Sequence, residues 1–305
     1  MAVTETAGAQ SSGTQLADAQ LISEDVLADE LSGLDNLEMR DATRPGLLRR
    51  TWKVVWPKVL AVGLALGAWQ IVVWSGWRPE YVLPSPATVL ARLWNDLGQA
   101  ETWQAVTTTL RRAGTGFGLA VVIGGALGAA VSASKTIRSG LGSLITGLQT
   151  MPSIAWFPLA LLLFGLSEPA ILFVVILGAA PAVANGVISG ISQVPVILLR
   201  AGRSLGATGL RAYRHVIIPA ALPSVMGGLK SGWAFAWRSL LAGELLVIIA
   251  SKPSIGASLE FQREFADTPG MLAVMLLILI IGILIDSLGF SIAERAVLRR
   301  RGLHV

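Results

Sequence analysis

The ionisable side chains Arg238, Glu244 and Asp286 lie inside long apolar stretches of the sequence. A charge at the centre of a bilayer costs on the order of 3 kcal/mol on insertion scales. Such residues therefore usually face protein or a water-filled cavity. An arginine in that position can attract a passing anion. The alternative is that each charge pairs with an opposite one and only fixes helix packing.

A basic connector, RAGRSLGATGLRAYRHVIIPAALP, separates two of the apolar stretches at residues 200–223. It carries four arginines and no acid: Arg200, Arg203, Arg211 and Arg214. The pattern predicts a short helix over 196–205, a turn at Gly206 and Gly209, and a second helix over 210–218. Pro219 and Pro223 then mark the start of the next helix.

The connector also presents small residues, Ala201, Gly202, Gly206 and Ala207, beside its arginines and Tyr213. Small residues let another surface approach closely, and arginines make directional contacts to carboxylates. The residues themselves fit equally well a helical hairpin held against anionic lipid.

Composition indicates a membrane protein. The 305 residues are 53% hydrophobic and 14% charged, with a mean hydropathy of +0.65. The chain has no cysteine, and its two histidines, His215 and His304, are too far apart in sequence to suggest a metal site. Its cations collect beside apolar runs, which indicates membrane orientation and not nucleic-acid binding. There is no phosphate-binding G-x-x-x-x-G-K-[ST] motif, so any ATP chemistry must come from a partner.

Six segments are long and apolar enough to cross a bilayer, because about 20 such residues suffice. Their approximate bounds are 54–77, 113–134, 139–167, 169–192, 224–250 and 271–293. The sequence thus predicts an all-α integral membrane protein, with six transmembrane helices in residues 46–305. The basic connector joins the fourth span to the fifth.

The first 45 residues differ from the rest, with nine acids against Arg40 and Arg44 and no aromatic side chain. Such a segment buries too little apolar surface to offset its loss of conformational entropy, so we expect a disordered acidic tail. It does not resemble a signal peptide. A regulatory or partner-binding role is the alternative to a passive tail.

The distribution of cations favours both ends of the chain in the cytoplasm. On that side lie the arginines of the connector together with Arg40, Arg44, Arg49, Arg50, Lys53, Lys135, Arg138, Arg295, Arg299, Arg300 and Arg301. The other side keeps Arg78, Arg92, Lys252 and Arg263, with Arg111 and Arg112 near an interface. An amphipathic pattern predicts an outer surface helix through Val89, Leu90, Leu93, Trp94 and Leu97. We therefore expect a multi-pass protein of the cell membrane (plasma or inner membrane), in which the basic connector is a cytoplasmic loop.

The connector resembles the signature loop of binding-protein-dependent ABC importer permeases, which runs Glu-Ala-Ala, three residues, Gly, nine residues, then Ile-x-Leu-Pro. The matching positions are Ala201, Gly206, Val216, Ile218 and Pro219. Arg200 stands in place of the glutamate and Gly202 in place of the second alanine. The resemblance covers residues 50–300: YVLPSPATVL, LRRAGTGFGLA, MPSIAWFPLALLLFG and WAFAWRSLLAGELL look like the branch importing aliphatic sulfonates, taurine or nitrate.

The resemblance implies a homodimeric permease with two ABC ATPase subunits and an extracytoplasmic solute-binding protein. ATP and Mg would bind the ATPase, and this chain would be no enzyme, with no cofactor or metal of its own, membrane lipid around it and no nucleic acid. In the family the loop forms coupling helices that dock on the ATPase. Carried over to this chain, that loop comprises Arg200, Ala201, Arg203, Gly206, Ala207, Tyr213, Val216, Ile218 and Pro219.

Candidates for lining the translocation pathway are Arg238, Glu244, Trp237, Met151 and Pro152. Arg238 and Glu244 are six positions apart, about 120° from facing alike on a helix, so a direct pair between them is unfavourable. Trp233 and Trp237 share a helical face and fit packing as well as a ligand cage. Met151-Pro152 predicts a kink that either exposes backbone carbonyls or only shapes the bundle.

Two further patterns are read as packing. Asp286 fits the inner half of the sixth span or a packing contact better than contact with a ligand. The glycines at 114, 118, 124, 125 and 128 give small-xxx-small spacings that favour close helix contact in the second span.

Aliphatic sulfonates are the leading solute, and taurine, nitrate, bicarbonate and vitamin precursors stay open, because permease motifs report coupling better than solute. A secondary transporter driven by an ion gradient is the rival class. It would need its own coupling-ion site and would have little use for the basic connector. A membrane enzyme is the third class, and the sequence offers it no metal cluster and no His/Cys arrangement.

Overall fold

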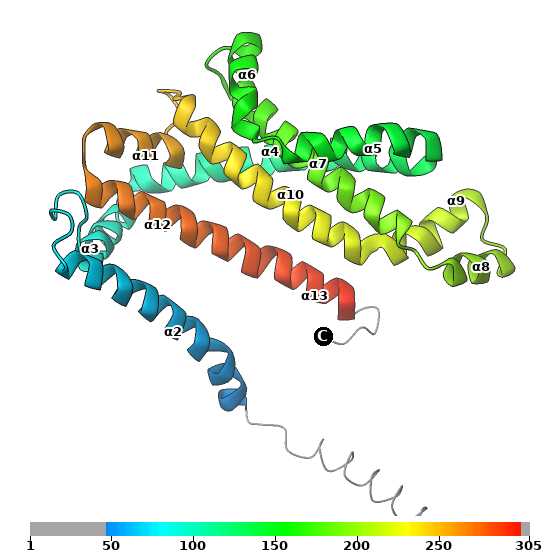
Figure 1. Cartoon of the computed structure of the whole chain (residues 1–305), viewed down its shortest axis with the longest axis horizontal. Helices are drawn as coiled ribbons and strands as arrows, with labels where there is room; N and C mark the ends of the chain where they lie inside the picture. The colour runs from blue at the N-terminus through cyan, green and yellow to red at the C-terminus, as the bar shows by residue number, and fades with distance from the viewer. Residues whose placement is uncertain (1–46, 300–305) are drawn as a thin grey trace, which may run out of the picture. The chain divides into compact units, whose positions relative to one another are not determined.

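A computed structural model describes residues 47–299, and every regular element among them is helical (Figure 1). The expected acidic tail at 1–45 lies outside the described residues. The chain divides between Ala68 and Trp69 into two parts. The α-helices are α2 (Leu47–Trp74), α3 (Pro86–Leu97), α4 (Ala100–Ala133), α5 (Lys135–Thr150), α6 (Phe157–Phe164), α7 (Glu168–Ser192), α8 (Val196–Ser204), α9 (Gly209–Ala212), α10 (Ile218–Leu246), α11 (Ile255–Glu264), α12 (Thr268–Leu284) and α13 (Ser291–Arg299).

Three short segments complete the described chain. The 3₁₀ turn η1 (Ser153–Trp156) precedes α6. The π-helical segments η2 (Tyr213–Ile217) and η3 (Ile285–Phe290) continue directly into α10 and α13. The bulk of the predicted sixth span, 271–293, is therefore α12, η3 and the start of α13.

The helix α2, which runs across the division of the chain, matches the first predicted span. Residues Val55–Trp74 are long and apolar enough to cross a bilayer. The helix ends at Trp74, three residues before the predicted limit, because Gly76 adopts a left-handed φ of +66° and turns the chain.

The core of the second part is a stack of three helices, with α7 packed along both α4 and α10 (Figure 1). Buried alanines and valines fill α7, and glycines bring the backbones together. A Cβ atom on Gly186 would lie 2.5 Å from Cα of Gly228, so the two helices touch backbone to backbone. Close approach of this kind is how helices associate within a membrane.

Of the five glycines expected to give close contact on the second span, Gly124 and Gly128 do so. Their added Cβ atoms would lie 2.4 Å and 2.7 Å from carbonyl oxygens of Ala180 and Ala184 in α7. The positions 114, 118 and 125 meet no neighbouring atom within 4 Å among the described residues. The two glycines that make contact, Gly124 and Gly128, are four residues apart on one helical face, and the other three expected glycines face away from α7.

Among the described residues, four helices are long and apolar enough to span a membrane: Val55–Trp74, Ala100–Ala133, Glu168–Ser192 and Thr268–Arg295. The helix α4 starts well before the predicted limit of residue 113. Its 34 residues extend roughly 51 Å, beyond the ~30 Å hydrocarbon core. The fourth predicted span, 169–192, coincides with α7.

The third predicted span, 139–167, is broken and not a single straight crossing. The helical segments Gly140–Thr150 and Ser153–Phe164 meet at 99°. Pro152 has no backbone N–H, and Met151 before it takes an extended conformation, so α5 ends there. The kink predicted at Met151-Pro152 is confirmed, while Pro158 only starts α6.

The fifth predicted span corresponds to α10, which begins six residues earlier and ends at Leu246, before the predicted limit of 250. It carries Lys230, Arg238 and Glu244 and is not among the helices apolar enough by composition to cross a membrane. Two shorter helices, α3 and α11, pack against α12. The apolar residues predicted to form one face of α3 do not share one environment. Val89 and Leu93 are buried, whereas Trp94 is 79% exposed.

Candidate functional site

The connector between α7 and α10 folds as a helical hairpin. The helix α8 ends at Ser204, and Gly206 and Gly209 follow with φ of +79° and +52°, a region that favours glycine. The segments α9 and η2 then continue into α10. At the base of the hairpin, a Cβ atom on Gly202 would lie 2.8 Å from Cγ2 of Val216. The predicted helix, turn and second helix are present, but Gly202 packs inside the hairpin and is not presented outward.

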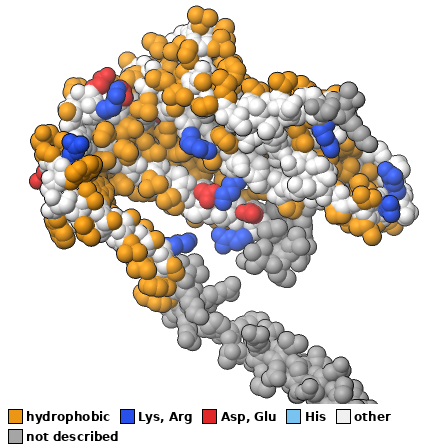
Figure 2. Space-filling model, in the orientation of Figure 1, with side chains coloured by type: hydrophobic (Ala, Val, Ile, Leu, Met, Phe, Trp, Pro, Cys, Tyr) orange, Lys and Arg blue, Asp and Glu red, His pale blue; other side chains and the backbone are white. Residues whose placement is uncertain are grey.

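The outward surface of this hairpin is both apolar and basic. Leu205 and Leu210 are 87% and 85% exposed. The four arginines of the hairpin are also exposed, and none lies within ion-pair distance of a carboxylate in residues 47–299. Figure 2 shows Lys and Arg side chains at the end of the molecule where Figure 1 places α8 and α9. Leucines this exposed beside unneutralised arginines indicate a surface for another molecule.

The other residues predicted to form the coupling loop differ in how exposed they are. Ala201, Tyr213 and Ile218 are exposed, whereas Ala207, Val216 and Pro219 are half-buried. Val216 faces Gly202 across the hairpin and so holds it closed.

One exposed face of α10 carries small and polar residues in place of large apolar ones. Gly227, Ser231, Ala234 and Arg238 are exposed and recur at helical spacing along one side. Nε of Arg238 donates to the carbonyl oxygen of Ala234 at 3.0 Å, and its guanidinium lies 4.8 Å from the Phe235 ring centroid. No carboxylate of the described chain lies within ion-pair distance of it.

The break between α5 and α6 is joined to α10. The hydroxyl of Ser239 donates to that of Ser153 at 2.7 Å. Ser153 follows Pro152 and Ser239 follows Arg238, but Ser239 is buried, so this bond lies off the exposed face of α10. Met151 and Pro152 are themselves exposed.

Glu244 lies apart from that face and is fully buried. Its carboxylate accepts hydrogen bonds from Arg112 Nη1 at 3.0 Å, Thr109 Oγ1 at 2.9 Å and the backbone N–H of Gly256 at 3.2 Å. Thr109 Oγ1 also accepts from the N–H of Ile255 at 3.0 Å. One carboxylate thereby joins α4, α10 and the start of α11.

The same junction extends to α7. Nε of Arg112 donates to Glu168 at 3.2 Å, and Nζ of Lys252 lies 2.8 Å from the other Glu168 oxygen. Because Arg112 is only 5% exposed, this pairing removes the cost of an isolated buried charge.

Trp237, the remaining pathway candidate, belongs to an aromatic cluster. It stacks on Trp233 with ring centroids 6.1 Å apart, and Trp233 meets Phe117 edge to face at 5.3 Å. Phe290 of η3 joins the cluster. Trp237 is 9% exposed, so most of its surface is used in packing.

Asp286 pairs with a cation on the neighbouring helix. Its carboxylate lies 3.1 Å from Nζ of Lys230, and both side chains are about half exposed. The pairing ties η3 to α10, in keeping with the predicted packing contact. In residues 47–299 no group of three or more His, Asp and Glu residues has the geometry to hold a metal ion.

Comparison with known proteins decides the family. Residues 118–297 match the family described as binding-protein-dependent transport system inner membrane component. The chain belongs to that family. This permease is 30% identical to the taurine transport system permease protein TauC of Escherichia coli (strain K12) over 259 residues, which are 81% of this chain and 92% of TauC. It is therefore a membrane transport subunit of multi-pass character.

The names of two further relatives mention other solutes. The permease is 31% identical to SsuC of the same Escherichia coli strain, named for aliphatic sulfonates transport, over 80% of this chain and 90% of SsuC. It is 32% identical to the nitrate import permease protein NrtB of Synechocystis sp. (strain PCC 6803), over 64% of this chain and 73% of NrtB.

Solved structures support the same fold. The permease superposes on a chain of the inward-facing MetNI methionine ABC transporter with a TM-score of 0.56 at 20% identity. The alignment covers 65% of this permease and 96% of that chain.

Sequence reasoning missed the partners of the buried charges. It placed Arg112 near an interface without a partner, and it gave no role to Thr109, Lys230 or Lys252. The usable signal was charge balance, because a glutamate inside a span requires a cation on a neighbouring helix. In the structure Arg112 of α4 pairs with Glu244, and Lys230 of α10 pairs with Asp286.

Proposed function

We propose that the permease, as two copies, forms the translocation pathway of an ATP-driven importer for a small organic anion, with aliphatic sulfonates first among the solutes. A separate ABC ATPase, in two copies, supplies ATP hydrolysis and binds ATP and Mg. An extracytoplasmic binding protein delivers the solute.

The observation that carries this proposal is the exposed face of α10. Helix faces that meet lipid carry large apolar side chains, as Leu162 and Leu279 do here. The face with Gly227, Ser231, Ala234 and Arg238 has none, and an arginine facing lipid would be costly. We infer that this face lines an aqueous pathway between two copies and that Arg238 attracts the anion in passage.

The break at Met151-Pro152 supports the same location. Non-helical backbone at membrane depth is tolerated where it lines a cavity or is buried in protein. Met151 and Pro152 are exposed, the next residue Ser153 is bonded to Ser239 of α10, and we place Met151 and Pro152 on the pathway. Trp237 and Glu244 act there indirectly, because packing and the buried ion pair hold the α10 helix in position.

For coupling, we propose that the α8–η2 hairpin docks on the ATPase. Exposed Leu205 and Leu210 would enter an apolar groove, and the hairpin arginines would meet carboxylates around it. Arg200, in place of the family's glutamate, makes this contact more basic than usual.

The proposed topology has six crossings and both ends in the cytoplasm. The broken pair around Met151-Pro152 counts as the third crossing, and α10 as the fifth. In this arrangement Arg238 faces the pathway while Lys230 and Glu244 pair with charges on neighbouring helices, which explains why the composition of α10 alone falls short of a lipid-exposed helix. The hairpin then lies in the cytoplasm, where the excess of Lys and Arg is expected.

The test is uptake by a strain lacking this gene, with radiolabelled ethanesulfonate, taurine, nitrate and bicarbonate offered separately. We expect ethanesulfonate uptake to disappear and to return with the wild-type gene. Uptake that survives deletion of the cognate ATPase gene but collapses with a proton uncoupler would instead establish an ion-gradient transporter. Loss of nitrate uptake alone would overturn the sulfonate assignment.

A further inference from the structure

A groove lies where α4 passes the start of α7 and the segment between α10 and α11. It consists of two hollows, of about 680 Å³ and 270 Å³, that share the residues Thr108, Arg111 and Lys252. From these shared residues the first hollow extends towards Ala100, where α4 begins, and the second extends the other way to Leu172 of α7. We call the two hollows together the basic groove.

The cations of the basic groove outnumber the carboxylates around them. Arg111, Arg112 and Lys252 line it. In the described chain the carboxylates within ion-pair distance of these three side chains are Glu168 and Glu244. Arg111 is exposed, and no described carboxylate lies within ion-pair distance of it. One positive charge is therefore left without a counter-charge, which favours an occupant with a single negative charge.

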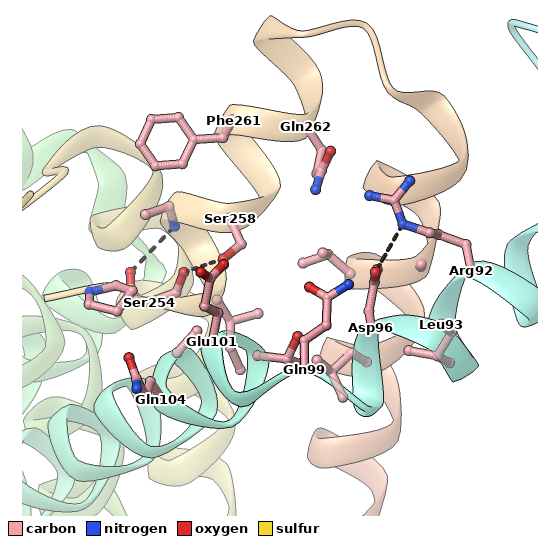
Figure 3. Close-up of a pocket in the computed structure, with 18 of the residues that line it drawn as sticks. Arg92, Leu93, Asp96, Gln99, Glu101, Gln104, Ser254, Ser258, Phe261 and Gln262 are labelled. Atoms are coloured by element: carbon pink, nitrogen blue, oxygen red, sulfur yellow. Dashed lines mark hydrogen bonds and ion pairs between the residues drawn. The ribbon is translucent and has the colours of Figure 1, made fainter.

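A separate cavity, between α3, the start of α4, α11 and α12, differs in this respect (Figure 3). Its cation, Arg92, binds Asp96 at 2.9 Å and Asp267 at 2.8 Å. Figure 3 shows the bond to Asp96. Because two carboxylates already share that arginine, this cavity has no positive charge left for an anion.

The buried arginine of the basic groove has a donor without an acceptor. Nε of Arg112 donates to one oxygen of Glu168 at 3.2 Å, while Nζ of Lys252 donates to the other oxygen at 2.8 Å. Nη2 of Arg112 lies on the same edge of the guanidinium as Nε, and it is buried with no hydrogen bond in the described chain. An unsatisfied buried donor is costly, so an oxygen acceptor brought into the groove would stabilise this junction.

The basic groove lies at the level expected for lipid headgroups. Residues Ala113–Ala133 of α4 carry no charge and extend roughly 30 Å, the thickness of the hydrocarbon core. Arg111 and Arg112 come directly before this run. Trp103, two turns before Arg111, is 54% exposed, and tryptophans are enriched at the membrane–water interface.

We propose that the basic groove binds the phosphodiester group of an anionic phospholipid, of which phosphatidylglycerol is a simple example. The phosphate lies between Arg111 and Lys252 and provides an oxygen acceptor for Nη2 of Arg112. A zwitterionic lipid fits less well, because both oxygens of Glu168 are already bound. No other described carboxylate lines the groove to receive an ammonium group.

The two ends of the groove match the two ends of such a lipid. Leu172 lies at the end next to the apolar run of α7, and the acyl chains leave past it. The opposite end carries Thr107, Ser251 and Trp103, whose polar groups suit the headgroup glycerol. A free phosphate or a small anionic solute would fill only the middle of the groove. The proposed topology assigns this lipid to the outer leaflet, but the site does not depend on which solute is carried.

The experiment is native mass spectrometry of the delipidated permease–ATPase complex, titrated with phosphatidylglycerol or with phosphatidylethanolamine of the same acyl chains. We expect phosphatidylglycerol to bind about tenfold more tightly, the effect of roughly one charged hydrogen bond. Arg111→Gln should remove this preference. Arg78→Gln, which removes another exposed arginine outside the groove, should leave it unchanged. Glycerol 3-phosphate, added at the concentration of the lipid, should not displace phosphatidylglycerol.

Equal affinity for the two lipids would overturn the proposal. Displacement of phosphatidylglycerol by glycerol 3-phosphate would also overturn it, because the groove would then be a site for free anions. A third contrary result is an Arg111→Gln variant that keeps its lipid preference. If that variant also captured the binding protein less well, Arg111 would be a protein contact and not a lipid contact.

Discussion

Nη1 of Arg112 lies 3.0 Å from Oε1 of Glu244, and both side chains are buried where α4, α7, α10 and α11 meet. Thr109 and the N–H of Gly256 complete the coordination of the carboxylate. A buried ion pair adds little net stability over an apolar contact, but removing one partner leaves a buried charge uncompensated. These four helices are therefore joined at one point.

Arg112→Leu should lower the free energy of unfolding by about 3–5 kcal/mol, because it strands the carboxylate of Glu244. Thermal unfolding of the detergent-solubilised protein measures this loss. Arg111→Leu, on the neighbouring exposed arginine, is the matched control and should have little effect. Adding Glu244→Leu to Arg112→Leu should recover part of the stability. Equal losses for both arginines would show that the pair has no special role.

Gly228→Ala should destabilise the packing of α7 on α10 by about 1–3 kcal/mol, because its Cβ would meet Cα of Gly186 at 2.4 Å. Gly227→Ala, one residue earlier, meets nothing within 4 Å and should be neutral or slightly stabilising. The yield of folded protein and its melting temperature separate the two. A melting temperature for Gly228→Ala at or above that of Gly227→Ala would contradict the backbone contact.

Arg238→Ala should lower anion uptake about tenfold while leaving ATPase co-purification unchanged, since the loss of one charged hydrogen bond is of that size. Arg238→Lys should retain part of the uptake, because the charge remains. Arg78→Ala removes another exposed arginine, outside α10, and serves as control. Undiminished uptake by Arg238→Ala would mean that Arg238 only packs on Phe235.

Leu205→Glu and Leu210→Glu should each weaken capture of the ATPase by at least about tenfold, because a carboxylate cannot enter an apolar groove without loss. Leu166→Glu changes a leucine that is also largely exposed but lies between α6 and α7, and it should leave capture intact. Pull-down of the ATPase by the tagged permease provides the measurement. Normal capture by both hairpin variants would place the docking surface elsewhere. Gly206→Trp is a less direct test, because at a φ of +79° it would also strain the hairpin.

The hairpin was predictable from sequence because its signals are local. Glycines at 206 and 209 fix the turn by their conformation, and arginines next to apolar residues define two short helices. The break at Met151-Pro152 was equally local, since a proline removes a backbone donor whatever surrounds it. Its angle depends on contacts with α7 and α10, among them the bond of Ser153 to Ser239.

The partners of the buried charges were not predictable, because they depend on which helices are neighbours. Glu244 and Arg112 are 132 positions apart, and only the stack of α4, α7 and α10 brings them together. The cavity between α3, α4, α11 and α12 also depends on tertiary structure, because its lining residues Arg92, Glu101 and Gln262 lie on three different helices. The exposed face of α10 was predictable only in part. The sequence predicts Arg238 inside a span, but it does not show that the small residues near it are exposed on the same face.

The backbone contact between Gly186 and Gly228 has a mechanical consequence. Gly228 lies ~14 Å along α10 from Pro219, where the hairpin ends, and ~15 Å from Arg238. On either side of that crossing Val183 of α7 packs on Gly232 and Val225 of α10 packs on Gly190, so the two helices interlock. The buried pair of Arg112 and Glu244 fixes the far end of α10 as well. A displacement of the hairpin would therefore move α7 and α10 together as one rigid pair and would reach Arg238 in the same direction.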